Sequence, residues 1–453
     1  MAITTINIGT AANDGTGDTL RDAFGYVNTN FQNFKIEGTN FTGSILIGHS
    51  TTGALSSALN NTGVGIGALD ALTTGDANVA IGYNTGTSIS TALNNTLVGA
   101  FAGDTLTNGS YNVAVGYFAL QAEDGHGRNV AVGWRALTNL NAGADAYNVA
   151  IGYDAGLSVS TGVNNTLIGG LAGDALTTGS NNVALGYLAL SLEDGHGRNV
   201  AIGYAALKNL NAGADAYNVA IGYEAGENVS TGTQNILIGG FSGDALTTGE
   251  NNVAIGYGAL TDDVAGKDNV AVGRLAMGAT DNARANVAIG YKALQALEYG
   301  SLTYSHNIGI GYEAGNDITT GLNNVIMGSF AADQLTTGSD NVAIGYAALS
   351  AENDHGRSVA VGKNALKLQD AGTSAYNVAV GFNAGEAIST GVQNVLIGGV
   401  AGDLLSTGSN NVAIGYEALS SEDAHGRNVA VGRGALKVQD AGADAYNIAI
   451  GYQ

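Results

Sequence analysis

The sequence predicts an all-β protein, a parallel β-solenoid of about 24 coils with a period of about 17 residues. A motif of the type Asn-Val-Ala-Ile-Gly-Tyr, as at 148–153, recurs from Ser44 to the end of the chain. Every copy has a β-branched residue after the Asn position, then Val, Ile, Leu or Met two places on, and then Gly. This period is too short for a pair of helices, and it suits one coil of a stack in which each coil contacts only its neighbours.

Each position of the motif predicts one feature of a coil. Val149 and Ile151 place two stiff apolar side chains on one face of a strand, and the Ala between them points the other way. The column formed by Asn148 and its counterparts is expected to hydrogen bond amide to amide along the stack. Gly152 stands where a Cβ would obstruct the turn after the strand, and Tyr153 begins a partial aromatic column.

The amino-acid composition indicates what the surface of the protein can contact. The chain has 71 Gly, no Pro and no Cys, and only 12% of its residues are charged. We therefore expect the small Ala- and Gly-rich face of each coil to contact another chain, in preference to Ala merely filling a thin coil interior. The net charge of −22 argues against binding nucleic acid through its phosphates and against an anionic membrane surface.

Two regions follow from these patterns. Residues 1–43 lack the motif and form an N-terminal domain, and residues 44–453 form the solenoid. From about residue 148 the coils group into a super-repeat of roughly 70 residues, because some steps between motifs are longer than the basic period. The extra residues are expected to form turns that project to one side, at 141–147, 211–217, 296–306, 371–376 and 441–446.

The N-terminal domain contains apolar residues at heptad spacing, with steps of 4, 3, 4 and 3 residues. This spacing predicts a short α-helix. The domain has few other apolar partners, so we expect helices from separate chains to meet at this seam and the domain to act as an attachment adaptor. The seam consists of Leu20, Phe24, Val27, Phe31 and Phe34.

The only candidate ligand-binding residues are histidines that recur in equivalent turns with an acidic residue just upstream. Metal ligation is one interpretation, and a solvated turn whose His bonds the loop backbone is the one we prefer, so no metal or cofactor is predicted. Repeated acidic pairs such as Glu123-Asp124 are typical of a solvated face, whereas a catalytic pair is normally unique, and no enzyme is predicted. The four histidines are His126, His196, His355 and His425.

Two resemblances bear on function. The Asn-Val-Ala-Ile-Gly motif resembles the Asn-Ser-Val-Ala-Ile-Gly motif of trimeric autotransporter adhesin heads, which implies β-rolls in which three chains pack side by side. Those heads have a shorter period than this chain. The segment 6–24, with 27–31, is similar to the amino-terminal module of tail fibres and other virion proteins of tailed phages, notably marine and cyanobacterial ones. Both resemblances imply a homotrimer and an elongated appendage.

These resemblances imply a structural virion protein, a trimeric tail fibre or appendage that attaches to the phage tail and reaches the host cell surface. Its expected partners are a tail or baseplate protein at the N-terminus, a host surface glycan or protein, and a tip protein over the last coil. The N-terminus shows no signal peptide, so we expect synthesis in the host cytoplasm, release by lysis and no membrane insertion. The alternatives are a bacterial trimeric surface adhesin of the same fold and a purely structural shaft without a receptor site.

Overall fold

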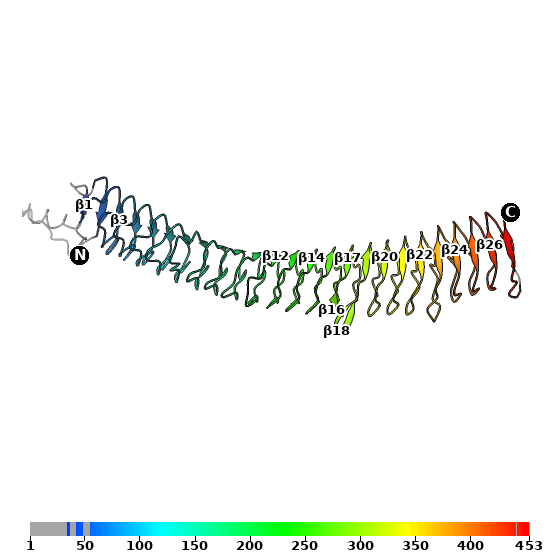
Figure 1. Cartoon of the computed structure of the whole chain (residues 1–453). Coiled ribbons are helices and arrows are strands. Elements are labelled where there is room, and N and C mark those ends of the chain that lie inside the picture. Colours follow the sequence, from blue (N-terminus) through cyan, green and yellow to red (C-terminus); the bar gives the residue numbers. More distant parts are fainter. Residues whose placement is uncertain (1–33, 37–41, 49–54, 441, 453) are drawn as a thin grey trace, which may run out of the picture. The chain divides into compact units, whose positions relative to one another are not determined.

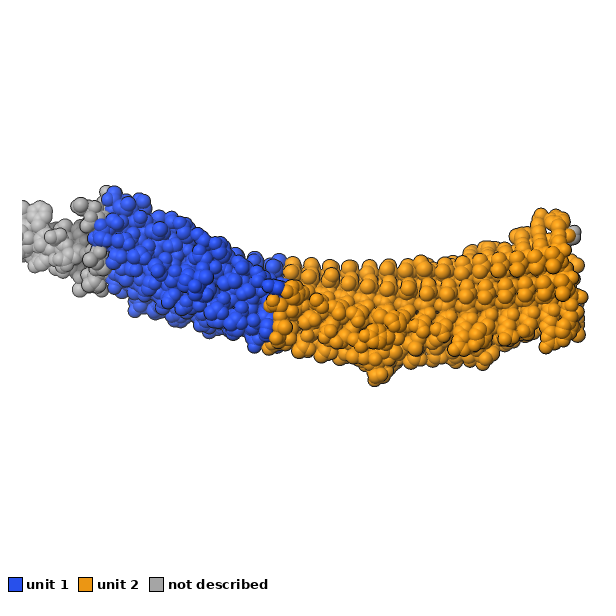
Figure 2. All heavy atoms as spheres, viewed as in Figure 1, with its two compact units in different colours: residues 1–199 blue, residues 200–453 orange. Residues whose placement is uncertain are grey.

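The computed structural model describes residues 34–36, 42–48, 55–440 and 442–452. These residues are all-β and contain no helix, and hence none long and apolar enough to cross a bilayer. They form a parallel β-solenoid of about 23 turns, as predicted, and equivalent residues of neighbouring coils such as Asn148 and Asn165 are 17 residues apart. The chain divides into two compact units, which we call unit 1 (residues 1–199) and unit 2 (residues 200–453) (Figure 2).

Unit 1 contributes one three-residue strand per coil, at the position that the motif predicts. A strand that precedes the first coil, β1, pairs antiparallel with β2. The strands are β1 (Phe34–Ile36), β2 (Ile45–Ile47), β3 (Thr62–Val64), β4 (Val79–Ile81), β5 (Thr96–Val98), β6 (Val113–Val115), β7 (Val130–Val132), β8 (Val149–Ile151), β9 (Thr166–Ile168) and β10 (Val183–Leu185).

Unit 2 continues the same pattern and adds two longer strands, β16 and β18, which pair with each other (Figure 1). Its strands are β11 (Val200–Ile202), β12 (Val219–Ile221), β13 (Ile236–Ile238), β14 (Val253–Ile255), β15 (Val270–Val272), β16 (Asp281–Arg284), β17 (Val287–Ile289), β18 (Glu298–Tyr304), β19 (Ile308–Ile310), β20 (Val325–Met327), β21 (Val342–Ile344), β22 (Val359–Val361), β23 (Val378–Val380), β24 (Val395–Ile397), β25 (Val412–Ile414), β26 (Val429–Val431) and β27 (Ile448–Ile450).

From β2 on, the motif strands of successive coils within a unit are parallel and in register (Figure 1). In β8 and β9, for example, Val149 lies opposite Thr166, and Ile151 lies opposite Ile168. Because the motif recurs at the same place in each coil, this register aligns equivalent side chains into columns along the stack. The columns are visible in unit 2 as parallel rows of atoms (Figure 2).

The middle residue of each three-residue strand from β2 to β26 is buried in the interior of the coil. Ala150 and Leu167 are completely buried, whereas Ile151 is 39% exposed. The expectation that the Ala face contacts another chain was therefore wrong, because Ala fills the thin interior. The residues that remain available on the surface are the β-branched and aliphatic ones at the first and third strand positions.

The Asn column is confirmed as a hydrogen-bonded ladder. Asn182 donates from Nδ2 to Oδ1 of Asn165 over 3.2 Å, and Asn165 in turn donates to the carbonyl of Gly179 over 2.9 Å. The same Oδ1 of Asn165 accepts the backbone N–H of Asn182 over 3.0 Å. The asparagines of the column from Asn61 to Asn428 are buried, so their side chains give hydrogen-bond partners to backbone groups that water cannot reach.

The Gly after the strand is also confirmed as a backbone requirement. Gly152 has a φ of +144°, and a Cβ built on it would lie 2.4 Å from the carbonyl oxygen of Gly169 in the next coil. Residues other than glycine rarely adopt that φ. A residue with a Cβ would also clash with the backbone of the next coil.

Two sequence predictions need correction. The segment 296–306 was predicted as a projecting turn; it does project from the coils (Figure 1), but it contains β18, which pairs with β16. Phe34 was predicted on a helix, but it begins β1, where it lies opposite Ile47 of β2. Antiparallel pairing with the first coil supplies backbone partners that a helix would not. The other four seam positions, 20, 24, 27 and 31, lie outside the described residues.

Candidate functional site

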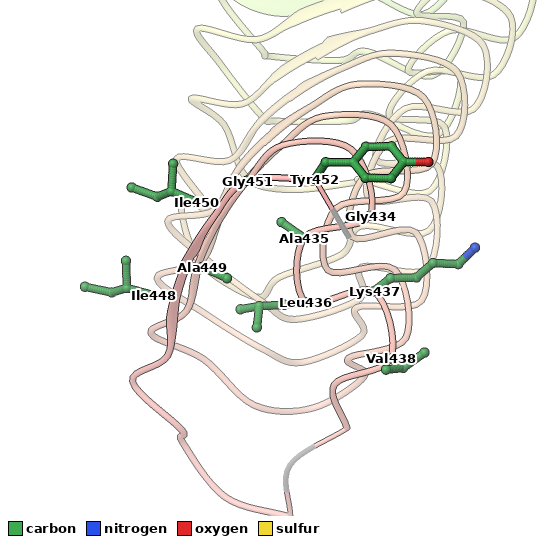
Figure 3. Close-up of a pocket in the computed structure, with 10 residues that line it drawn as sticks. All are labelled: Gly434, Ala435, Leu436, Lys437, Val438, Ile448, Ala449, Ile450, Gly451 and Tyr452. Atoms are coloured by element: carbon green, nitrogen blue, oxygen red, sulfur yellow. The ribbon is translucent and has the colours of Figure 1, made fainter.

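An apolar surface of each unit is formed by the first and third positions of the solenoid strands, and we call it the outward face. In the motif, Val149 is half-buried and Ile151 is exposed. Figure 3 shows the same alternation in β27, where Ile448 and Ile450 point away from the coil and Ala449 points into it. In-register pairing turns these residues into apolar ladders that run along each unit.

A second surface feature is the partial aromatic column after the recurring glycine of the coils. Tyr153 is 55% exposed, as are comparable tyrosines in other coils. Where neighbouring coils both carry an aromatic ring, the rings contact each other, some of them stacked and others edge to face. Tyr204 and Tyr223, for example, lie 5.1 Å apart with an interplanar angle of 9°. In this pair each tyrosine covers one face of the other ring, so less of the aromatic surface is open to a ligand.

The long turns carry exposed Arg-Asp-Tyr groups. The guanidinium of Arg128 donates to Asp145 over 2.7 Å and to the hydroxyl of Tyr147 over 2.7 Å. Arg427 makes the same contacts with Asp444 and Tyr446. These side chains are exposed, so the ion pairs contribute little to stability and serve mainly to fix the shape of the turn.

The four predicted histidines lie in equivalent turns, which we call the Glu-His turns. In the first, Glu123 is completely buried and its Oε1 accepts the backbone N–H of His126 over 2.9 Å. The imidazole Nδ1 of His126 lies 3.6 Å from the same Oε1. The turns at His196, His355 and His425 repeat this arrangement, with distances of 3.6, 3.7 and 3.4 Å between the same two atoms.

This geometry corrects two predictions about the turns. The histidine was expected to bond the loop backbone through its side chain, but the glutamate carboxylate makes that bond instead. The acidic pair was expected to be solvated, but only Asp124 is exposed, and Glu123 occupies the interior. The Glu123 carboxylate can be buried because the hydrogen bond from the backbone N–H of His126 offsets part of the cost of its desolvation.

The buried glutamates were missed as functional residues, although the sequence carries a signal for them. The same position of most other coils holds a buried aliphatic residue, as in Leu106, Leu140 and Leu176. An acidic residue at a coil position that is mostly aliphatic predicts a buried carboxylate, which needs a hydrogen-bonding or charged partner. In unit 2 part of that partner is Gln369, whose Nε2 donates to Oε2 of Glu352 over 2.9 Å.

Burial perturbs several of these carboxyl groups. Desolvation raises the pKa of Glu123 and Glu352, against the lowering effect of the hydrogen bonds that each accepts. Asp263 takes the place of the glutamate in a related turn of unit 2, where burial raises its pKa to about 6. Burial likewise raises the pKa of Asp244 and of Asp333 to about 6.

Unit 2 is expected to be more stable at pH 5 than at pH 7.5. Between the ordinary pKa of 3.8 and the folded-state value of about 6, folded Asp263 binds more protons than the unfolded chain does. Its stabilising contribution is therefore full below pH 3.8 and is lost as the pH rises through 6. Thermal unfolding at the two pH values should give a Tm several degrees higher at pH 5.

The matched variant for this prediction is Asp263→Asn, which keeps an oxygen to accept the backbone N–H of Gly266. It should reduce the difference in Tm between the two pH values, because the amide does not titrate. Equal Tm values for the unchanged protein at pH 5 and pH 7.5 would contradict the expectation.

A surface hollow with a volume of about 540 Å³ lies on the last described coil (Figure 3). It is lined by 434–438 and 448–452. In Figure 3 Leu436 and Ala449 point into the coil beneath it. Every other coil covers the equivalent surface with its neighbour, so the hollow reflects the stacking pattern and carries no chemistry of its own.

Comparison with known proteins gave no match to a family model, to a curated protein or to a solved structure.

Proposed function

We propose that this chain is a structural virion protein, a homotrimeric tail fibre or appendage of a tailed phage. Residues 1–43 would attach it to a tail or baseplate protein, and the solenoid would extend to a glycan or protein of the host surface. The observation that carries this proposal is the outward face, an apolar surface that each unit leaves uncovered along its strands.

The outward face suits contact between copies of this chain. Ile81, Ile151 and Ile289 are 41%, 39% and 39% exposed, and each belongs to a row of aliphatic neighbours in the adjoining coils. Contiguous exposed apolar surface of this kind marks protein interfaces, since monomeric proteins rarely leave it in water. Three copies that turn these faces toward a common axis would bury the ladders and leave the polar turns outside.

The remaining surface suits a multivalent appendage. The net charge of −22 opposes non-specific association of the turns with other acidic surfaces. Equivalent turns recur in successive coils, so weak contacts with a host receptor would add through effective concentration. In this proposal the seam from Leu20 to Phe31 brings the three chains together at the tail, and a tip protein covers the far end of the solenoid.

Charge on the outward face is expected to dissociate the trimer. The purified protein should have the native mass of three 45.2 kDa chains by light scattering. The variant I81K/I151K/I289K should run as a monomer at micromolar concentration, because each lysine would be desolvated at the interface. A stable monomer of the unchanged protein would overturn the trimeric appendage.

The matched control places three lysines at exposed aliphatic positions of the turns. Leu192, Val264 and Leu368 are 51%, 44% and 51% exposed and lie off the outward face. The L192K/V264K/L368K variant should remain a trimer. If both triple variants become monomers, the effect is one of added charge and the outward face is not the interface. A trimer that binds no glycan or cell surface would favour the structural shaft.

A further inference from the structure

We propose that the four Glu-His turns are Zn²⁺ sites, each complete within one chain. Each turn brings one imidazole nitrogen and oxygens of two carboxylates within 4.8 Å of one another. The sets are Glu123, Asp124 and His126; Glu193, Asp194 and His196; Glu352, His355 and Asp370; and Glu422, Asp423 and His425.

The spacing of the two inner ligand atoms fits a tetrahedral ion. Bonds of 2.0–2.1 Å from Zn²⁺ to nitrogen and oxygen place two ligand atoms about 3.3 Å apart. The distance from Nδ1 of His425 to Oε1 of Glu422 is 3.4 Å, and it is 3.6 Å for His126 and Glu123. Neither Nδ1 atom makes a hydrogen bond, and these separations are close to that of two ligands sharing a metal ion.

The buried atoms of the first turn support the same conclusion. Glu123 is completely buried, and its Oε2 has no hydrogen-bond partner. Nδ1 of His126 is also buried without a hydrogen-bond partner, although the rest of the imidazole is open to solvent. Buried polar atoms are normally bonded, and a carboxylate in an aliphatic column is costly without a cation. A cation bound between Nδ1 of His126 and the Glu123 carboxylate would give the imidazole nitrogen a partner and offset the buried negative charge.

The histidine is not needed to form the turn. In the related turn of unit 2, Asp263 accepts the backbone N–H of Gly266 over 2.7 Å, and glycine stands where the other turns have histidine. That turn keeps the buried carboxylate and the backbone bond, yet it does not assemble a metal-ligand cluster. Formation of the turn therefore does not explain why the other four turns have histidine at this position.

The second carboxylate is present in each cluster even where the sequence changes. In three turns it is the Asp that follows the buried Glu, as in Asp124. The third turn has Asn353 at that position, and Asp370 from the next coil takes its place in the cluster. An exposed carboxylate therefore lies beside the Glu-His pair in all four clusters, either from the residue after the glutamate or from the next coil.

In unit 2 an amide holds the buried carboxylate in place. Gln369 donates from Nε2 to Oε2 of Glu352, and Gln439 does the same to Oε2 of Glu422 over 3.2 Å. Oε1 of each glutamate accepts the backbone N–H of the histidine and also lies nearest to Nδ1, so it is the oxygen that would contact the ion. Hydrogen bonds of this kind orient the ligands of metal sites.

The ligand chemistry selects Zn²⁺ over the hard cations. Ca²⁺ and Mg²⁺ are bound by oxygen ligands, whereas imidazole with carboxylate suits Zn²⁺. One nitrogen and two oxygens supply three of four tetrahedral positions, and water supplies the fourth. The imidazole edge is exposed, with 34% of the His126 side chain accessible, so the ion has a path from solvent.

Calorimetric titration of the full chain with Zn²⁺ at pH 7.5 tests the proposal. We expect about four ions per chain at micromolar concentration, because the structure holds four clusters. The variant H126Q/H196Q/H355Q/H425Q should lose all four tight sites and keep its fold by circular dichroism. The control His306→Gln, which removes a histidine that stacks on Tyr304, should retain four.

Substitution with Co²⁺ gives an independent readout. Tetrahedral coordination by one nitrogen and three oxygens should give a visible absorption band in the unchanged protein and none in the quadruple variant. Zn²⁺ binding that survives in the quadruple variant, or that requires millimolar metal, would show adventitious binding to surface acids and overturn the proposal. The clusters lie within one chain, so the result is independent of whether the native mass is that of a trimer.

Discussion

Replacing Gly152 with alanine is expected to destabilise unit 1 by about 4 kcal/mol. The φ of +144° is costly for any residue with a Cβ, and the added Cβ would lie 2.4 Å from the carbonyl oxygen of Gly169 and 2.6 Å from its carbon. Backbone atoms of the neighbouring coil cannot move aside without breaking the ladder, since Gly169 N donates to the carbonyl of Ile151 over 2.8 Å.

The matched control is Gly143→Ala, in a long turn of the same unit. Gly143 also has a positive φ, of +69°, but a Cβ there would meet nothing within 4 Å. The control should cost only about 1 kcal/mol, the ordinary penalty for the left-handed conformation. Urea unfolding followed by hydrogen exchange of unit 1 amides distinguishes the two. Equal losses in both variants would mean that the close approach of coils adds no cost.

The second large effect is expected from Asn252→Ala, in the middle of the ladder of unit 2. Asn252 donates from Nδ2 to Oδ1 of Asn235 over 3.1 Å and to the carbonyl of Gly266 over 2.8 Å. Its own Oδ1 accepts the backbone N–H of Asn269 over 3.1 Å. Alanine leaves these buried groups without partners, which should cost about 3–5 kcal/mol.

Asn228→Ala provides the comparison, because Asn228 is an exposed asparagine of the same unit. Its Oδ1 accepts one exposed hydrogen bond from Asn209, which water can replace. The control should change the free energy of unfolding by about 0.5 kcal/mol or less. If Asn252→Ala is equally mild when measured by chemical unfolding, the ladder is a consequence of stacking and does not stabilise it.

The sequence was sufficient to predict the period, the strand positions, the Asn ladder and the need for glycine after each strand. All four depend on local chemistry that recurs in every coil. β-Branched residues two apart define a strand, and a recurring Asn such as Asn165 can reach only its counterparts in the neighbouring coils. Repetition made each of these signals readable many times over.

The sequence did not reveal which face of the strand is inside. Ala and Val are both apolar, so alternation alone leaves two choices. The width of the coil decides between them. In β19 the middle position holds Gly309, where even a Cβ would lie 2.6 Å from Cγ of Leu294. Only small residues, or a large one compensated elsewhere in the coil, fit at that point.

The burial of Glu123 escaped prediction for a different reason. Acids are normally exposed, and a neighbouring Asp strengthens that expectation. The decisive fact is three-dimensional, because the N–H of His126 points into the coil and offers the carboxylate a partner. Comparing Glu123 with Leu106 and Leu140 at the same coil position would have indicated it.

The in-register stacking of coils has a consequence for how this gene can vary. Asn148, Asn165 and Asn182 hold equivalent places in successive coils, and each strand offers the next the same edge. Deleting residues 165–181 would place Asn182 beside Asn148, where Asn165 lies now. The strand after Asn182, β10, would then pair with β8 in place of β9, and it has the same length. Recombination between the long super-repeat blocks can therefore change the number of coils in whole steps, and length can evolve separately from the architecture that sets it.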